Sequence, residues 1–263
     1  MKKILIGVGL TWAMTWALTL AGCGGGDKPA PKTDAAATPA GGAAAMPDME
    51  NGATITGKVA FDGAKPTPKT LDMSAVPKCM EAHKTPPKSE EVVINDNGTV
   101  KNVFVWVKAG LPADKTWQVP TTAVMLSQDG CMYTPHVIGV MAGQNIDIKN
   151  ADPTGHNIHP QPVNNPDFNQ SQPPGTPDID HSFAREEVLI PVKCNIHPWM
   201  RAYIGVVNHP FFAVTGDDGS YSIKGLPPGT YTIEIVHEKY GKQEQQVTVG
   251  AKDSKTQDFK ITG

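Results

Sequence analysis

Short stretches in which apolar and polar residues alternate recur along the chain from about residue 53 to its last residues. They are rich in valine, isoleucine, threonine and aromatic residues, and glycine, proline, asparagine or aspartate separates them. The stretches are TITGKVAF, EVVIN, VKNVFVWV, AVMLS, HVIGVMA, NIDIKN, EVLIPVKC, AYIGVVN, FFAVT, SYSIKG, TYTIEIVHE, QQVTVG and TQDFKITG. No convincing long amphipathic helix interrupts them. The pattern predicts an all-β fold of Greek-key β-sandwiches.

The start of the chain has a different pattern. Lys2 and Lys3 precede an uncharged run of 17 residues, 4–20. Such a run is typical of a signal peptide, here residues 1–22, although a membrane-spanning helix of about 17–25 residues is the alternative. The sequence Leu20-Ala21-Gly22-Cys23 resembles the lipobox of bacterial lipoproteins, which implies lipid attachment to Cys23 and a periplasmic location. Gly24, rather than aspartate, then favours the outer membrane.

Composition and charge limit what the segment after Cys23 can do. Residues 23–52 consist mostly of alanine, glycine, proline, aspartate and lysine, so they predict a disordered tether with a reach of about 30 Å. The formal charge of −3 becomes −5 once Lys2 and Lys3 leave with the signal peptide. A mildly acidic chain without a basic stripe excludes nucleic acid as a partner and favours a basic or neutral docking partner.

The sequence CNIHPWM, residues 194–200, offers a thiolate, an imidazole and a thioether at regular spacing. A blue-copper site needs two histidines and one cysteine near a plane and a weak axial methionine. The second histidine is expected from an earlier strand end. His156 follows such an end directly, because the alternating run 145–149 breaks at Asp152-Pro153.

These two segments resemble the copper-binding signature of the cupredoxins, and the short Cys-x2-His-x2-Met loop is most similar to that of the amicyanin-like members. The resemblance covers roughly residues 117–207. It implies a copper cofactor with His156, Cys194 and His197 as equatorial ligands and Met200 as the axial ligand.

The same resemblance assigns roles to residues around the ligands. It implies that Asn157 ties the two ligand loops together and that the carbonyl of Gly155 lies near the metal. Ile196 stands where an amicyanin-like loop has proline, so a second backbone N–H can reach the cysteine sulfur and raise the reduction potential. His159 is expected at the surface. Trp199 is expected either above the metal or packed against the proline-rich segment 160–177.

The end of the chain resembles a second family. Two tight turns, at Asp218-Gly219 and Pro228-Gly229, flank a strand around Tyr221 and Ile223. This arrangement is similar to the carboxypeptidase regulatory-like domain, a transthyretin-like sandwich whose first strand resembles TITGKV near residue 54. We therefore predict a sandwich split between residues 53–111 and 208–263, with a copper domain of residues 112–207 inserted. Two domains in tandem, with 53–207 as an extended cupredoxin, is the alternative.

Two more cysteines, Cys79 and Cys131, form an even pair in a chain expected to be exported. A disulfide between them would contribute about 4 kcal/mol through its loop of roughly 50 residues. The alternative is a second metal site formed with His83 and His136.

The predicted function is one-electron transfer between redox protein partners by a lipid-anchored periplasmic type 1 copper protein. An axial methionine leaves no open position for substrate, so we do not expect an enzyme. Two alternatives remain open: a lipoprotein that binds or delivers copper, and a cell-surface interaction module with a structural copper.

Overall fold

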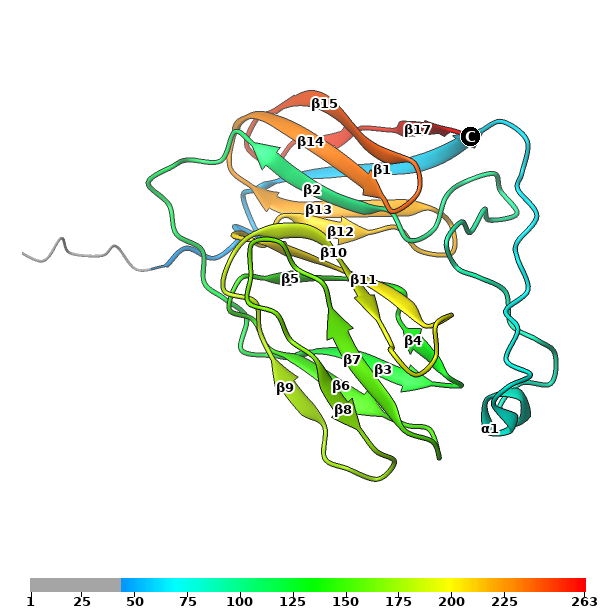
Figure 1. Cartoon of the computed structure of the whole chain (residues 1–263). Helices are drawn as coiled ribbons and strands as arrows, with labels where there is room; N and C mark the ends of the chain where they lie inside the picture. The colour runs from blue at the N-terminus through cyan, green and yellow to red at the C-terminus, as the bar shows by residue number, and fades with distance from the viewer. Residues whose placement is uncertain (1–43) are drawn as a thin grey trace, which may run out of the picture. The chain divides into compact units, whose positions relative to one another are not determined.

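The computed structural model of the chain describes residues 44–263, which form β-strands and one short helix (Figure 1). The predicted all-β sandwich fold is confirmed. The elements are β1 (Ala53–Asp62), α1 (Pro77–Glu81), β2 (Phe104–Ala109), β3 (Val124–Asp129), β4 (Met132–Thr134), β5 (Val137–Met141), β6 (Ile146–Asn150), β7 (His156–Pro160), β8 (Gln170–Gln172), β9 (Ile179–His181), β10 (Glu187–Lys193), β11 (Arg201–Val207), β12 (Phe212–Val214), β13 (Ser220–Leu226), β14 (Gly229–His237), β15 (Gly241–Val249), β16 (Ser254–Thr256) and β17 (Phe259–Thr262).

One pair of sheets joins strands that lie far apart in the sequence. β1 pairs with β13 in antiparallel orientation and with β16 and β17 in parallel orientation, while β2 lies between β12 and β14. The inward residues of these strands form one hydrophobic core, including Ile55, Val59, Val105, Val107, Tyr221, Ile223, Tyr231, Ile233 and Phe259. Strands from both sides of residues 112–207 therefore share sheets, as the split arrangement requires; the domain boundaries themselves stay a prediction.

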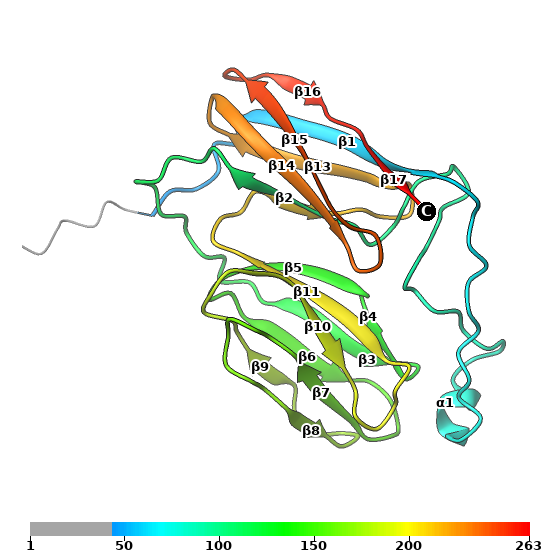
Figure 2. The same ribbon diagram turned by 45° about the horizontal axis from the view of Figure 1, so that its top comes forward.

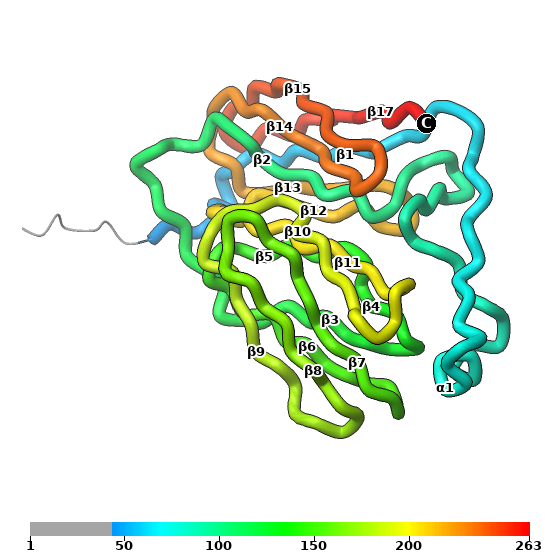
Figure 3. Tube along the Cα trace, viewed as in Figure 1, coloured from blue at the N-terminus to red at the C-terminus, as the bar shows by residue number. Residues whose placement is uncertain are grey.

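The strands between residues 124 and 207 form a second pair of sheets. One sheet has the order β5-β11-β10-β7-β8 and the other the order β4-β3-β6-β9. A second core fills the space between these sheets, with Leu126, Ile146, Ile148, Ile158, Ile190, Val192, Ile204 and Val206 among its buried residues. The tube view follows the chain through both sheets (Figure 3).

β2 lies between the first core and a third, smaller cluster that it forms with Val137 of β5 and Val207 of β11. Its residues 104–107 are all buried, since Val105 and Val107 face the first core while Phe104 and Trp106 face β5 and β11. A strand buried on both faces reads as a continuous apolar run, which explains the sequence VFVWV. A Cβ at Gly205 would lie 2.4 Å from the ring of Phe104, so glycine is needed where that ring approaches the strand.

Several segments differ from the sequence-based expectations. EVVIN forms no strand; it makes only an isolated bridge between Ile94 and Val100, because the turn between them folds the chain back at once. The proline-rich segment contributes the short strands β8 and β9, which pair with β7 and β6. Residues 45–52, expected in the disordered tether, make main-chain hydrogen bonds, among them Ala45 N–H to Thr116 O at 2.7 Å.

The signal peptide, Cys23 and most of the predicted tether lie in residues 1–43, outside the described part of the chain. Within residues 44–263, no helix has the length and apolar character needed to cross a membrane. An irregular segment, 63–91, carries α1 and runs outside the sheets (Figure 2).

Candidate metal centre

Two neighbouring strands bring the predicted ligands together. His156 is the first residue of β7, and the loop 194–200 connects β10 to β11. β7 pairs with β10 through Lys193 and His159, so the start of β7 lies beside the end of β10. The strand pairing therefore places a histidine against a loop that follows it by almost 40 residues.

Three donor atoms converge at this point. Nδ1 of His156 lies 2.9 Å from Nδ1 of His197, which lies 3.8 Å from Sγ of Cys194. One ligand atom from each of the three residues lies within 4.8 Å of the others, and all three residues are buried. Met200 is buried in the same hydrophobic core. The role of these four residues as metal ligands stays a prediction.

Backbone hydrogen bonds hold the loop in a tight turn. The N–H of Met200 donates to the carbonyl of His197 at 3.0 Å, and the N–H of Cys194 donates to the carbonyl of Met200 at 3.4 Å. The side-chain oxygen of Asn157 accepts from the N–H of Asn195 at 2.5 Å, so it links the two ligand segments. Gly155 directly precedes β7, and space is open around it.

Asp152 belongs to the site, although the sequence placed it only in a turn. Its Oδ2 accepts a hydrogen bond from Nε2 of His156 at 2.8 Å. Its two oxygens also accept from the backbone N–H groups of Gly130 and Cys131, at 2.7 and 2.8 Å. This contact leaves Nδ1 of His156 free to face His197. A carboxylate four residues before a predicted ligand histidine is the signal that would have identified it.

Burial, hydrogen bonds and nearby charges shift the pKa values of the three donor residues. Burial lowers the pKa of His156, but the hydrogen bond to Asp152 and the proximity of Cys194 outweigh it and raise the pKa. Burial lowers the pKa of His197, and the nearby His156 lowers it further. Burial raises the pKa of the Cys194 thiol, yet hydrogen bonds from His156 and from the N–H groups of Asn157, His197 and Ile196 bring it below its usual range.

The other two cysteines within residues 44–263 form a disulfide beside this site. Cys79 on α1 is bonded to Cys131 between β3 and β4. Sγ of Cys79 lies 3.7 Å from Nε2 of His197, on the side of the ring away from Cys194. Trp199 donates through Nε1 to the carbonyl of Cys131 at 3.0 Å, and its ring centroid lies 5.2 Å from that of His197, so it contacts both the disulfide loop and a predicted ligand.

The other predicted histidines lie elsewhere. His83 contacts the carbonyl of Gly130 at 2.7 Å, and His159 contacts Asn195 on the outer side of the loop. The disulfide uses both cysteines that the alternative, a second metal site with His83 and His136, would need.

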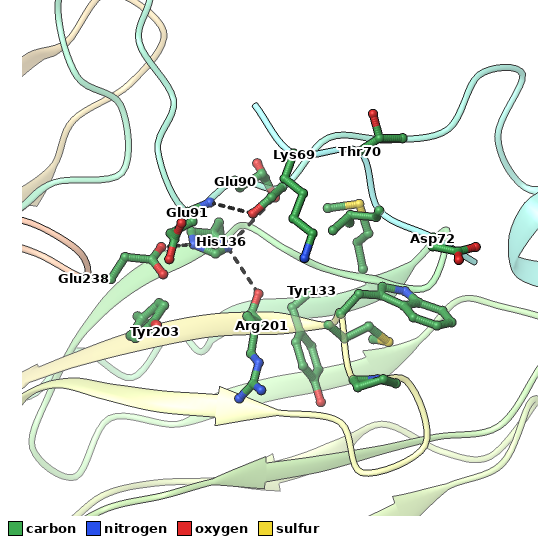
Figure 4. A pocket seen from close by; sticks show the side chains of 16 residues that line it. Lys69, Thr70, Asp72, Glu90, Glu91, Tyr133, His136, Arg201, Tyr203 and Glu238 are labelled. Atoms are coloured by element: carbon green, nitrogen blue, oxygen red, sulfur yellow. Dashed lines mark hydrogen bonds and ion pairs between the residues drawn. The ribbon is translucent and has the colours of Figure 1, made fainter. Parts of the chain in front are cut away.

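His136 lines a cavity of about 570 Å³ beside the ligand loop (Figure 4). Its ring contacts the carbonyl of Arg201 at 3.1 Å and pairs with the carboxylate of Glu238. Trp199 and Met200 line the same cavity. His136 therefore connects the ligand-loop side of the cavity to the end of β14.

The donor set fits copper. Two imidazole nitrogens and one thiolate, buried and without a carboxylate among the three converging atoms, match the ligand preference of a metal that alternates between Cu(I) and Cu(II). The outer nitrogen of His156 is held by Asp152, which fixes the ring with its inner nitrogen directed at the site.

Comparison with known proteins finds a matching family model and similar solved structures. A family model, the carboxypeptidase regulatory-like domain, matches residues 198–262, which include β11 to β17. No curated protein matches the chain.

Similar solved structures include three copper proteins. The copper-containing nitrite reductase from Thermus scotoductus SA-01 has 20% identity, a TM-score of 0.30, and coverage of 34% of this chain and 23% of that one. The purple cupredoxin from Nitrosopumilus maritimus has 23% identity, a TM-score of 0.27, and coverage of 32% and 98%. Amicyanin from Paracoccus versutus has 18% identity, a TM-score of 0.28, and coverage of 39% and 96%. The chain thus has an all-β fold, and its residues 198–262 are similar to a carboxypeptidase regulatory-like domain.

Proposed function

We propose that this chain is a type 1 copper protein that carries single electrons between redox protein partners. The observation that supports the proposal most directly is the buried convergence of His156, Cys194 and His197, with Met200 in the same core. Bound copper would supply a one-electron couple between Cu(II) and Cu(I).

The chain's own residues would hold one geometry for both oxidation states. Asp152 fixes the ring of His156, and Asn157 fixes the start of the ligand loop through Asn195. Backbone N–H groups directed at the sulfur of Cys194 stabilise its thiolate form. Burial of the donors excludes water, so little solvent has to reorganise when the charge of the centre changes.

The remaining parts of the proposal come from the sequence. We propose export, lipid attachment at Cys23 and a position on the periplasmic side of the outer membrane. We also propose that the protein is not an enzyme and that its redox partners have a neutral or basic docking surface, since the mature chain is acidic.

The test is the optical and electron-paramagnetic-resonance spectrum of the chain from residue 24, loaded with Cu(II). We expect an intense thiolate-to-copper band and narrow hyperfine splitting, and we expect both to disappear in Cys194→Ser. His159→Gln is the matched control, because His159 lies on the same strand as His156 but outside the cluster. Ordinary Cu(II) features in all three proteins would reject the electron-carrier function in favour of copper handling or a structural role.

A further inference from the structure

Sulfur-containing side chains are gathered in the core around the candidate centre. The core between the second pair of sheets buries five sulfur-containing side chains from separate parts of the chain, and a sixth, Met132, packs against it; the buried five are Met73, Cys79, Cys131, Cys194 and Met200. Thiolates and thioethers are the ligands that favour Cu(I). The spacing of these residues along the chain gives no sign of this cluster, because the fold alone brings them together.

The two cysteines of the disulfide lie close to His197, as the ligands of a second metal site would. Sγ of Cys79 is 3.7 Å from Nε2 of His197, and ligand atoms of Cys79, Cys131 and His197 all lie within 4.8 Å of one another. Nδ1 of His197 faces the other way, toward Cys194. The imidazole of His197 therefore separates two groups of sulfur ligands, each facing one of its nitrogens.

The segment that carries Cys79 is attached to the rest of the molecule by few elements. α1 has five residues and lies in the irregular segment 63–91, outside the sheets (Figures 1 and 2). A hollow of about 540 Å³ lies against α1, with Met73, Met80 and His83 in its lining. Met80 is 51% exposed. Cys79 is fully buried, so a reductant reaches the disulfide when this segment of little regular structure opens locally, which costs less free energy than opening the sheets.

We propose that Cys79 and Cys131, when reduced, form a second site that binds Cu(I), completed by Nε2 of His197. A dithiol reductant supplies two electrons: it becomes a disulfide, the bond between the two Sγ atoms breaks, and two thiols form. Each thiol releases its proton to solvent when Cu(I) binds, and the ring N–H of His197 is released as a third proton when both of its nitrogens hold an ion. The second ion would lie one imidazole ring away from Cys194, so the site fits a role in accepting copper before the buried centre is filled.

The test measures how many Cu(I) ions the mature chain withholds from a chromophoric Cu(I) chelator under anaerobic conditions. The protein is assayed as purified and after treatment with dithiothreitol, which is then removed. We expect about one ion per chain before reduction and about two afterwards. No additional ion after reduction would overturn the proposal.

Cys194→Ser separates this site from the proposed electron-transfer centre. We expect this variant to bind no ion tightly before reduction and one afterwards. If the wild-type protein also bound none before reduction and one afterwards, the electron-transfer proposal would fail while the present one would stand. A gain in the doubly substituted Cys79→Ser, Cys131→Ser chain equal to that of the wild type would contradict the assignment.

Because substitution of both cysteines can itself unfold the chain, a second measurement uses reduced Cys194→Ser protein in which Cys79 and Cys131 are intact. X-ray absorption of its bound Cu(I) should show two sulfur neighbours and one nitrogen neighbour. The nitrogen should be lost in Cys194→Ser, His197→Phe, with a fall of about tenfold or more in Cu(I) affinity. A copper surrounded only by nitrogen and oxygen would overturn the proposal.

Discussion

Oδ2 of Asp152 accepts hydrogen bonds from both Nε2 of His156 and the backbone N–H of Cys131, each at 2.8 Å. One carboxylate oxygen thus connects a predicted metal ligand to the disulfide loop. The carboxylate fixes the orientation of the His156 ring and keeps a proton on its Nε2. This is the usual function of a group hydrogen-bonded to a metal-binding histidine.

Asp152→Asn should weaken copper binding by about 10–100-fold. The amide has one acceptor oxygen in place of two, so its NH2 group must face either the ring N–H of His156 or the backbone N–H of Gly130, and the negative charge beside the ring is lost. Competition with a Cu(II) chelator measures the change. Asp167→Asn is the control, since Asp167 also faces a histidine, at 3.6 Å from Nε2 of His159, but its side chain is 78% exposed. Equal affinity in the two variants would show that Asp152 has no such role.

Ile196→Pro should lower the reduction potential of the copper-loaded protein. Proline has no N–H, so the thiolate of Cys194 loses one of its backbone hydrogen bonds. A hydrogen bond contributes about 1 kcal/mol and a tenfold change in a one-electron equilibrium is about 59 mV, so we expect a shift on the order of 50 mV. Ile196→Ala keeps the N–H, and redox titration should leave its potential close to that of the wild type; identical shifts would argue against the hydrogen bond as the cause.

Trp106→Phe should destabilise the chain more than Trp117→Phe. Nε1 of Trp106 donates at 3.0 Å to Oε1 of Glu234, a residue that is 1% exposed and whose other oxygen accepts from Lys108. The ring nitrogen of Trp117 makes no hydrogen bond within residues 44–263. A buried acceptor left without its donor costs about 1–3 kcal/mol. Denaturant unfolding of both variants measures the difference, and similar free energies of unfolding would mean that Glu234 finds another donor.

Stability should fall as the pH drops below neutral. Burial lowers the pKa of His209 and of His237 to about 4, below the ordinary value of a histidine in the unfolded chain. The folded state therefore binds fewer protons, so the contribution of each histidine is complete above about pH 6.5 and is lost progressively toward pH 4. The full loss of unfolding free energy is about 3 kcal/mol for each histidine.

Unfolding free energies measured between pH 7 and pH 4.5 test this dependence. In His237→Asn, the side-chain oxygen can still accept from the N–H of Lys239, as Nδ1 of His237 does at 3.1 Å, but the residue no longer titrates. The slope of stability against pH should be smaller in this variant. An unchanged slope would show that His237 does not contribute to it.

Local patterns were enough to predict much of the fold. The alternation in SYSIKG and TYTIEIVHE predicted β13 and β14, because side chains on opposite faces of a strand meet core and solvent in turn. EVVIN is equally rich in β-branched residues and forms no strand, since strand formation also needs a partner in a sheet. The short strands β8 and β9, which follow no strong pattern, form because β7 and β6 offer them partners.

By itself, the sequence determined the all-β class and the convergence of His156, Cys194 and His197, since the residue types and their order along two segments carry that information. Only the tertiary structure decided that Asp152 supports His156, that Trp199 binds the disulfide loop and that Cys79 lies against His197. Contacts within one loop depend on spacing along the chain. Contacts between α1, the turn after β3 and the ligand loop depend on how the sheets pack, and no local pattern specifies that packing.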